Sequence, residues 1–138
     1  MKVLFICYLN VARSQMAEAI FNHLADGHST AISAGVKPGD SSGKTIKELE
    51  PLVIECMNEI GIDVSHGVSK PLTQKIFDEA DIVVSMIGKE WLPEYARHSR
   101  KVRYWHVDDP EHMTHAGKAR TRDKIYSRVK RLIKEGNK

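Results

Sequence analysis

The chain has 138 residues, of which 41% are hydrophobic and 28% are charged, and its 21 basic and 18 acidic side chains leave a net charge of +3. These proportions are ordinary for a soluble globular protein and exclude a collagen, a coiled coil and a wholly disordered chain. We expect a single domain, residues 1–138. At this length it buries roughly two-thirds of the surface of the unfolded chain, so it needs neither a disulfide nor a structural metal to fold.

Neither a membrane segment nor a secretion signal is expected. The longest apolar run, Val3 to Leu9, is seven residues long, whereas a membrane-spanning helix needs about 20. The run is also too short for a signal peptide, and no A-x-A cleavage site follows it. The two cysteines, Cys7 and Cys56, are fewer than a secreted disulfide-bonded domain usually carries. We therefore expect a cytoplasmic protein.

Hydrophobic patterning predicts strands that alternate with helices. The strands are expected at 3–6, 30–33, 81–86 and 102–107. The helices are expected at about 14–26, 45–60, 74–79 and 90–96 and in the C-terminal segment. Pro51 either kinks the second helix or starts a new one. The alternation predicts an α/β fold, a parallel sheet with helices on both faces.

The segment that follows the first strand carries the clearest chemical signal. It reads Cys7-Tyr8-Leu9-Asn10-Val11-Ala12-Arg13-Ser14. A tight loop between a strand and a helix directs several backbone N–H groups inward, and the start of the helix adds the positive end of its dipole. Arg13 adds a planar guanidinium suited to tetrahedral oxyanions. The same positive field favours the thiolate form of Cys7, which makes it a nucleophile.

The alternative for Cys7 is an inert cysteine that ends a buried strand. A cysteine followed by an arginine six positions later also occurs by chance. The preceding strand and the following helix, which Ser14 is expected to cap, favour an anion-binding loop. Parallel sheets bind ligands beyond the carboxyl ends of their strands. The first strand ends at Cys7 and the fourth at Asp109, so both are expected on one edge of the sheet.

The spacing of Cys7, Asn10, Arg13 and Ser14, followed by residues 16–19, resembles the signature of the low-molecular-weight protein tyrosine phosphatases and of their relatives, the thioredoxin-coupled arsenate reductases. Further matches lie, in the same order, at 33–35, 61–63, 80–84 and 108–110. The resemblance spans nearly the whole chain and implies a flavodoxin-like, four-stranded parallel sheet. It also implies hydrolysis of phosphate monoesters through a cysteinyl-phosphate, without a metal or another cofactor.

The resemblance assigns roles to individual residues. Cys7 matches the nucleophile, Arg13 the residue that holds the phosphoryl oxygens, and Asp109 the general acid. The remaining matches form and support the phosphate-binding loop: Tyr8, Leu9, Asn10, Val11, Ala12, Ser14, Glu18, Ser33 and His66. The implied substrate is a phosphorylated protein or a small phosphate or arsenate oxyanion.

Several residues depart from the family pattern. Leu9 stands where the family usually has glycine, so the edge of the loop is bulkier. Lys70 stands where arsenate reductases have an aspartate that helps to bind potassium, and its ammonium is a candidate substitute for that cation. The two further cysteines of the reductases are missing from the segment after the third strand, 85–91. Cys56 is interpreted as a small core residue of its helix.

Two other functions stay open at this stage. The segment 104–110 is more similar to the reductases than to the phosphatases, so arsenate reduction with an external thiol donor is the alternative. Residues 118–138 contain nine basic and two acidic side chains, which allows a phosphate- or nucleic-acid-binding module. Nucleic acid is the less favoured partner because Tyr126 is the one aromatic residue among these cations. A metal site at His106, His112 and His115 is not expected, because their spacing matches no common zinc pattern.

Overall fold

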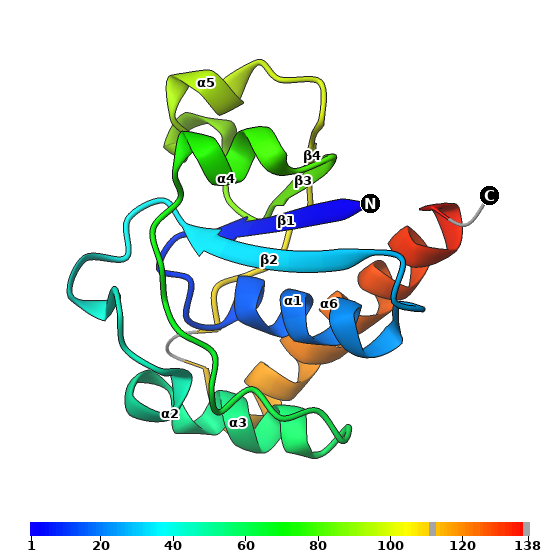
Figure 1. Ribbon diagram of the computed structural model, residues 1–138. Coiled ribbons are helices and arrows are strands. Elements are labelled where there is room, and N and C mark those ends of the chain that lie inside the picture. The colour runs from blue at the N-terminus through cyan, green and yellow to red at the C-terminus, as the bar shows by residue number, and fades with distance from the viewer. Residues whose placement is uncertain (111–112, 137–138) are drawn as a thin grey trace.

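Four strands form one parallel sheet in the computed structural model, which describes residues 1–110 and 113–136. The strands are β1 (Lys2–Cys7), β2 (Thr30–Gly35), β3 (Ile82–Ser85) and β4 (Val102–Tyr104). Their order is β2-β1-β3-β4, and every neighbouring pair is parallel (Figure 1). This order confirms the expected flavodoxin-like α/β fold. The chain passes from β2 on one side of β1 to β3 on its other side. Sheets of this kind bind ligands at the carboxyl ends of the strands where this switch occurs.

Helices cover both faces of the sheet, as expected (Figure 1). One face carries α1 (Arg13–Leu24), α2 (Ile46–Leu49), α3 (Pro51–Asn58) and α6 (His115–Gly136). The other face carries α4 (Gln74–Glu79) and α5 (Glu94–Arg97). Side chains of β1 alternate between these layers: Val3 and Phe5 belong to the larger core beneath α1 and α6, and Leu4 and Ile6 to the smaller core beneath α4 and α5.

Most predicted elements differ from the structure by one or two residues at their ends, and three differ by more. The second helix ends at Leu49 and restarts with Pro51 as the first residue of α3, where its missing N–H removes no hydrogen bond. The helix expected at 90–96 is wrong: a 3₁₀ turn (Lys89–Trp91) precedes Pro93, and only then does α5 begin. The fourth strand ends at Tyr104 instead of residue 107, because its neighbour β3 ends opposite it, at Ser85.

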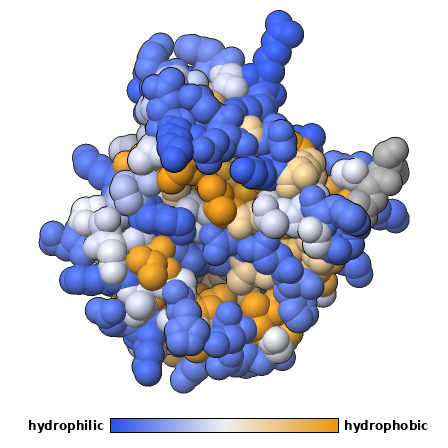
Figure 2. Space-filling view, viewed as in Figure 1, coloured by the Kyte–Doolittle hydropathy of each residue, from blue (hydrophilic) through white to orange (hydrophobic). Residues whose placement is uncertain are grey.

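Polar side chains cover most of the molecular face shown in Figure 2, with a few hydrophobic side chains between them. None of the helices formed by residues 1–110 and 113–136 combines the length and the apolar character that a membrane crossing requires.

Candidate active site

A pocket of about 120 Å³ opens at the carboxyl end of β1. Cys7 is the last residue of β1 and Arg13 the first of α1, so the anion-binding loop, residues 7–14, forms one wall. The pocket is lined by Cys7, Leu9, Val11, Ala12, Arg13, Ser41, Leu49, Glu50 and Asp109. The structure therefore brings together the three residues expected to carry the chemistry, Cys7 and Arg13 from one loop and Asp109 from the segment that follows β4.

The backbone of the loop turns sharply at Asn10. Its φ of 60° is the one positive φ of a non-glycine residue in the described part of the chain. Asparagine tolerates this left-handed conformation better than most residues, and its buried side chain is held at both ends. Its Oδ1 accepts a 3.0 Å hydrogen bond from the backbone N–H of Lys70, and its Nδ2 donates to Ser14 Oγ at 2.7 Å. These two bonds fix the curvature of the loop.

Two further side chains hold the loop from outside. Gln15 Nε2 donates to the backbone oxygen and to the Oδ1 of Asn10, both at 3.2 Å. Ser69 Oγ donates to the carbonyl of Leu9 at 2.7 Å. Neither Gln15 nor Ser69 was identified from the sequence. The polar Gln15 in the buried first turn of α1 was a usable signal, but nothing local to Ser69 reveals its contact 60 residues away.

Ser14 acts on the sulfur instead of capping the helix. Cys7 Sγ and Ser14 Oγ lie 2.8 Å apart. Because the Nδ2 of Asn10 already donates to this oxygen, the hydroxyl hydrogen of Ser14 can point to the sulfur and stabilise a thiolate. The helix cap expected at Ser14 is wrong. Ser14 is the second residue of α1, and the cap position belongs to Ala12, which has no side-chain oxygen. The first N–H groups of α1 therefore have no side-chain cap from that position, which suits an anion.

Arg13 is anchored by the segments that follow β3 and β4. Its Nη1 donates to the carbonyls of Met86, at 2.9 Å, and Val107, at 3.1 Å. Nη2 lies 3.6 Å from Oδ2 of Asp109. With Nη1 held by two carbonyls, the guanidinium is fixed at the pocket wall, with its Nε and Nη2 donors remaining for a bound oxyanion. Only 8% of Arg13 is exposed, so little water surrounds its positive charge.

Two of the expected supporting residues, Glu18 and Ser33, contact each other. Ser33 Oγ donates to Glu18 Oε1 at 2.9 Å, and the ammonium of Lys70 lies 3.8 Å from the same oxygen. A lysine nitrogen thus stands beside Glu18, as expected if it takes the place of a cation. His66 is exposed. The hydrogen bonds to Asn10 come from Gln15 and Lys70, and none from His66 to the loop is found in the described part of the chain.

Gly35 lets the loop approach the end of β2. A Cβ atom at this position would lie 2.8 Å from the carbonyl carbon of Leu9 and from the oxygen of Tyr8. Real Cβ atoms do not come this close to backbone, so only glycine fits. Tyr8 itself points away from this contact and packs edge-to-face on Trp91 at 5.7 Å, and Trp91 is exposed.

The histidines and the second cysteine lie apart from the pocket lining. His106 pairs with Asp108 at 3.7 Å, whereas His115 pairs with Glu59 at 3.4 Å; His112 lies outside the described residues. His106 and His115 thus have different partners. Cys56 is buried on α3, where burial and then the nearby Glu59 carboxylate raise the pKa of its thiol. Cys56 is not among the residues that line the pocket.

Comparison with known proteins agrees with this geometry. Residues 2–138 match the family described as low molecular weight phosphotyrosine protein phosphatase. Arsenate reductase 1 of Bacillus cereus is 31% identical over 136 residues, which cover 97% of this chain and 95% of that protein.

Two solved structures are also similar over nearly their whole length. A low molecular weight protein tyrosine phosphatase from T. tengcongensis has a TM-score of 0.83 and 29% identity, covering 98% of this chain and 99% of the other. A YwlE arginine phosphatase variant, solved with a phosphorylated active-site serine, has a TM-score of 0.82 and 28% identity, covering 100% and 97%. This chain therefore belongs to the low molecular weight phosphotyrosine protein phosphatase family.

Proposed function

We propose that this chain hydrolyses phosphate monoesters through a cysteinyl-phosphate intermediate. The observation that carries the proposal is the shared pocket of Cys7, Arg13 and Asp109, with the Ser14 hydroxyl 2.8 Å from the sulfur. A nucleophile, an anion-binding cation and an acid thus surround a space suited to one small group. The family membership supports the same reaction.

In the first step the sulfur of Cys7 attacks phosphorus. The sulfur–phosphorus bond forms as the bond to the leaving oxygen breaks, and Asp109 gives that oxygen its proton. The guanidinium of Arg13 and the loop amides hold the other three oxygens, where charge develops in the transition state.

In the second step water attacks the cysteinyl-phosphate. Asp109, now a carboxylate, takes a proton from the water, and the sulfur leaves as a thiolate. The Ser14 hydroxyl stabilises that thiolate by the bond already present in the structure. Inorganic phosphate is released and Asp109 is again protonated, so the cycle closes without a redox change.

Arsenate reduction is the second candidate, since the Bacillus cereus relative named above is an arsenate reductase. Reducing arsenate to arsenite takes two electrons, which two thiols supply as they form a disulfide. The chain has two cysteines, and Cys56 does not line the pocket. The second thiol therefore has to come from an external donor. A reducing cytoplasm, where we place the protein, provides such donors.

One comparison separates these functions. The purified protein is given an aryl phosphate, a phosphotyrosine peptide, a phosphoarginine peptide, and arsenate with glutathione or a redoxin, with the Cys7→Ala variant as control. A labelled oligonucleotide tests the binding-module alternative. We expect Cys7-dependent phosphate release. Arsenite formation without phosphate release would replace the proposal by the reductase, and oligonucleotide binding without either turnover would replace it by the binding module.

A further inference from the structure

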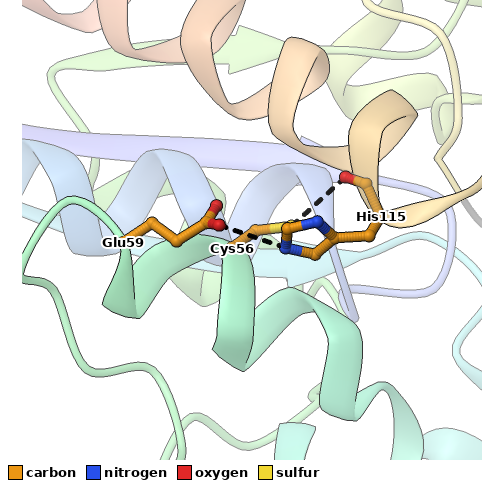
Figure 3. Close-up of side chains that lie close together, drawn as sticks. All are labelled: Cys56, Glu59 and His115. Atoms are coloured by element: carbon orange, nitrogen blue, oxygen red, sulfur yellow. Dashed lines mark hydrogen bonds and ion pairs between the residues drawn. The ribbon is translucent and has the colours of Figure 1, made fainter.

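Three side chains of metal-binding types converge where α3 ends and α6 begins. Cys56 lies in the last turn of α3, Glu59 follows that helix, and His115 is the first residue of α6. One sulfur, one carboxylate oxygen and one imidazole nitrogen of these residues all lie within 4.8 Å of one another (Figure 3). The closest pair, His115 Nε2 and Glu59 Oε2, is 3.4 Å apart.

Cys56 is a fully buried residue of the core, near Val53 and Met57 in α3. Its thiol nevertheless has a polar partner, because it donates to the carbonyl of His115 at 3.6 Å. The interpretation of Cys56 as a small core residue therefore accounts for its burial and not for its polar neighbours.

A second layer of contacts orients the carboxylate. Arg122 Nη1 donates to Glu59 Oε1 at 2.7 Å and to the carbonyl of Cys56 at 2.6 Å. The bond to Oε1 leaves the other oxygen, Oε2, directed at His115. The guanidinium is itself balanced by Asp123, 2.8 Å from Nη2. Such outer contacts commonly hold metal ligands in place. Because Asp123 balances the charge of Arg122, a metal ion at this position would face the charges of one carboxylate and one ionisable thiol.

We propose that Cys56, Glu59 and His115 bind a divalent transition-metal ion of the zinc type. Thiolate, imidazole and carboxylate are the ligands that zinc takes in proteins. As the sulfur–metal bond forms, the thiol gives its proton to solvent, and no electron is transferred. Three protein ligands leave a fourth position for water. The side chains of His115 and Glu59, 43% and 47% exposed, give the ion a path from solvent.

The proposed site joins two parts of the chain that are distant in sequence. His115 follows the segment that carries Asp109, and α3 follows the pocket residue Glu50. A bound ion would cross-link the start of α6 to the end of α3 and so stabilise the folded chain. This role is independent of the proposed hydrolysis, in which the ion takes no part.

Cobalt(II) is the probe, because a thiolate ligand gives it a near-ultraviolet charge-transfer band and tetrahedral geometry gives it visible bands. The full-length, reduced Cys7→Ser variant is titrated, so that the pocket thiolate cannot contribute. We expect one equivalent to bind with both sets of bands, zinc to displace it, and either ion to raise the melting temperature.

Added to this background, Cys56→Ser should remove the charge-transfer band. His115→Ala should weaken binding by more than the roughly 10–100-fold typical of losing an outer-shell partner. His98→Ala, at an exposed histidine elsewhere, is the matched control and should bind normally. Absence of the bands in the Cys7→Ser background, or unchanged bands in both ligand variants, overturns the proposal. If Cys56→Ser does not fold, His115→Ala and Glu59→Gln, at half-exposed side chains, decide it.

Discussion

The ammonium of Lys118, on α6, donates a 2.6 Å hydrogen bond to the carbonyl of Pro110, the residue after Asp109. The same nitrogen lies 3.5 Å from Oε1 of Glu50, which lines the pocket. Only 1% of Lys118 is exposed, and a lysine is buried this completely only where its charge is well paired. A single buried cation thus connects the segment that carries the proposed acid to the opposite wall of the pocket.

Replacing Lys118 by methionine should slow the hydrolysis of esters with poor leaving groups more than that of esters with good ones. Methionine keeps the apolar stem and removes the ammonium, so the carbonyl of Pro110 keeps its 3.0 Å bond from the Met113 N–H and loses the one from Lys118. The position of Asp109 should then be less fixed. Loss of a buried hydrogen bond from a charged group costs about 1.5–3 kcal/mol of stability. Stopped-flow rates with two leaving groups and a urea titration measure the two effects.

Lys124→Met, an exposed lysine on the same helix, is the matched control and should change neither quantity. A double-mutant cycle of Lys118→Met with Asp109→Asn tests the positional role. If Lys118 acts through Asp109, the double variant is hardly slower than Asp109→Asn alone. Fully additive losses would mean that Lys118 supports the fold and not the acid.

Asp109→Asn should steepen the dependence of rate on leaving-group basicity. A basic leaving oxygen gains from protonation as its bond breaks, whereas a nitrophenolate gains little. General acid catalysis contributes roughly 10²–10⁴-fold, and the loss should appear with the basic group. The measurement is a plot of log rate against leaving-group pKa under single-turnover conditions. Equal slopes for wild type and variant would exclude Asp109 as the acid and make Asp108 the next candidate.

Cys7→Ser should abolish turnover and leave oxyanion binding largely intact. The loop amides and Arg13 hold the anion, whereas the attack requires the thiolate. Turnover should fall by several orders of magnitude, as for other enzymes that lose their nucleophile. Phosphate binding, followed by calorimetry, should persist, with circular dichroism as the control for folding. Activity within about tenfold of wild type would show that Cys7 is not the nucleophile.

Gly35→Ala should displace the anion-binding loop. The added methyl would lie within 2.9 Å of backbone atoms of Tyr8, Leu9 and Asn10, so the loop has to move. Overpacking of this kind costs about 1–3 kcal/mol, and a 1 Å misplacement of reacting groups can cost roughly 10²-fold in rate. Steady-state kinetics and thermal melting test both.

Gly88→Ala is the control for Gly35→Ala, because the atoms nearest its new methyl are the carboxylate end of Glu90, which can rotate away. We expect it to retain wild-type kinetics. A Gly35→Ala variant that also kept wild-type kinetics would show that the loop tolerates a shift in position, and that its exact packing on β2 is not required.

The alternation of strands with helices and the anion-binding loop were predictable from local patterns, whereas the flavodoxin-like sheet was implied by the resemblance to the family. Cys7 ends an apolar run and Arg13 begins a helix, so the loop between them was evident from the residues alone. The contacts of Ser69 and Lys118 were not predictable. Each reaches a backbone carbonyl of another segment, Leu9 for one and Pro110 for the other, and any polar side chain at either position has the same local pattern.

The basic C-terminal helix shows the same limit. Its basic side chains, considered above as a possible phosphate- or nucleic-acid-binding surface, do not all face solvent. Lys118 and Arg122 point inward and are buried, whereas Arg120 and Lys124 are exposed. Helical periodicity identifies which residues share a face, but the carboxylates that make burial of a cation possible, Glu50 and Glu59, flank the two ends of α3.

The two carbonyls that hold Arg13 lie 73 and 94 residues further along the chain. The anion-binding loop is synthesised before β3 and β4, so its arginine finds these acceptors only after β3 has joined β1 and β4 has joined β3. Such long-range pairing is slow, because distant segments must meet first. A nascent or partly folded chain consequently contains the cysteine without its anchored arginine. If the completed loop binds phosphate, as we propose, phosphate stabilises the product of this last stage of folding.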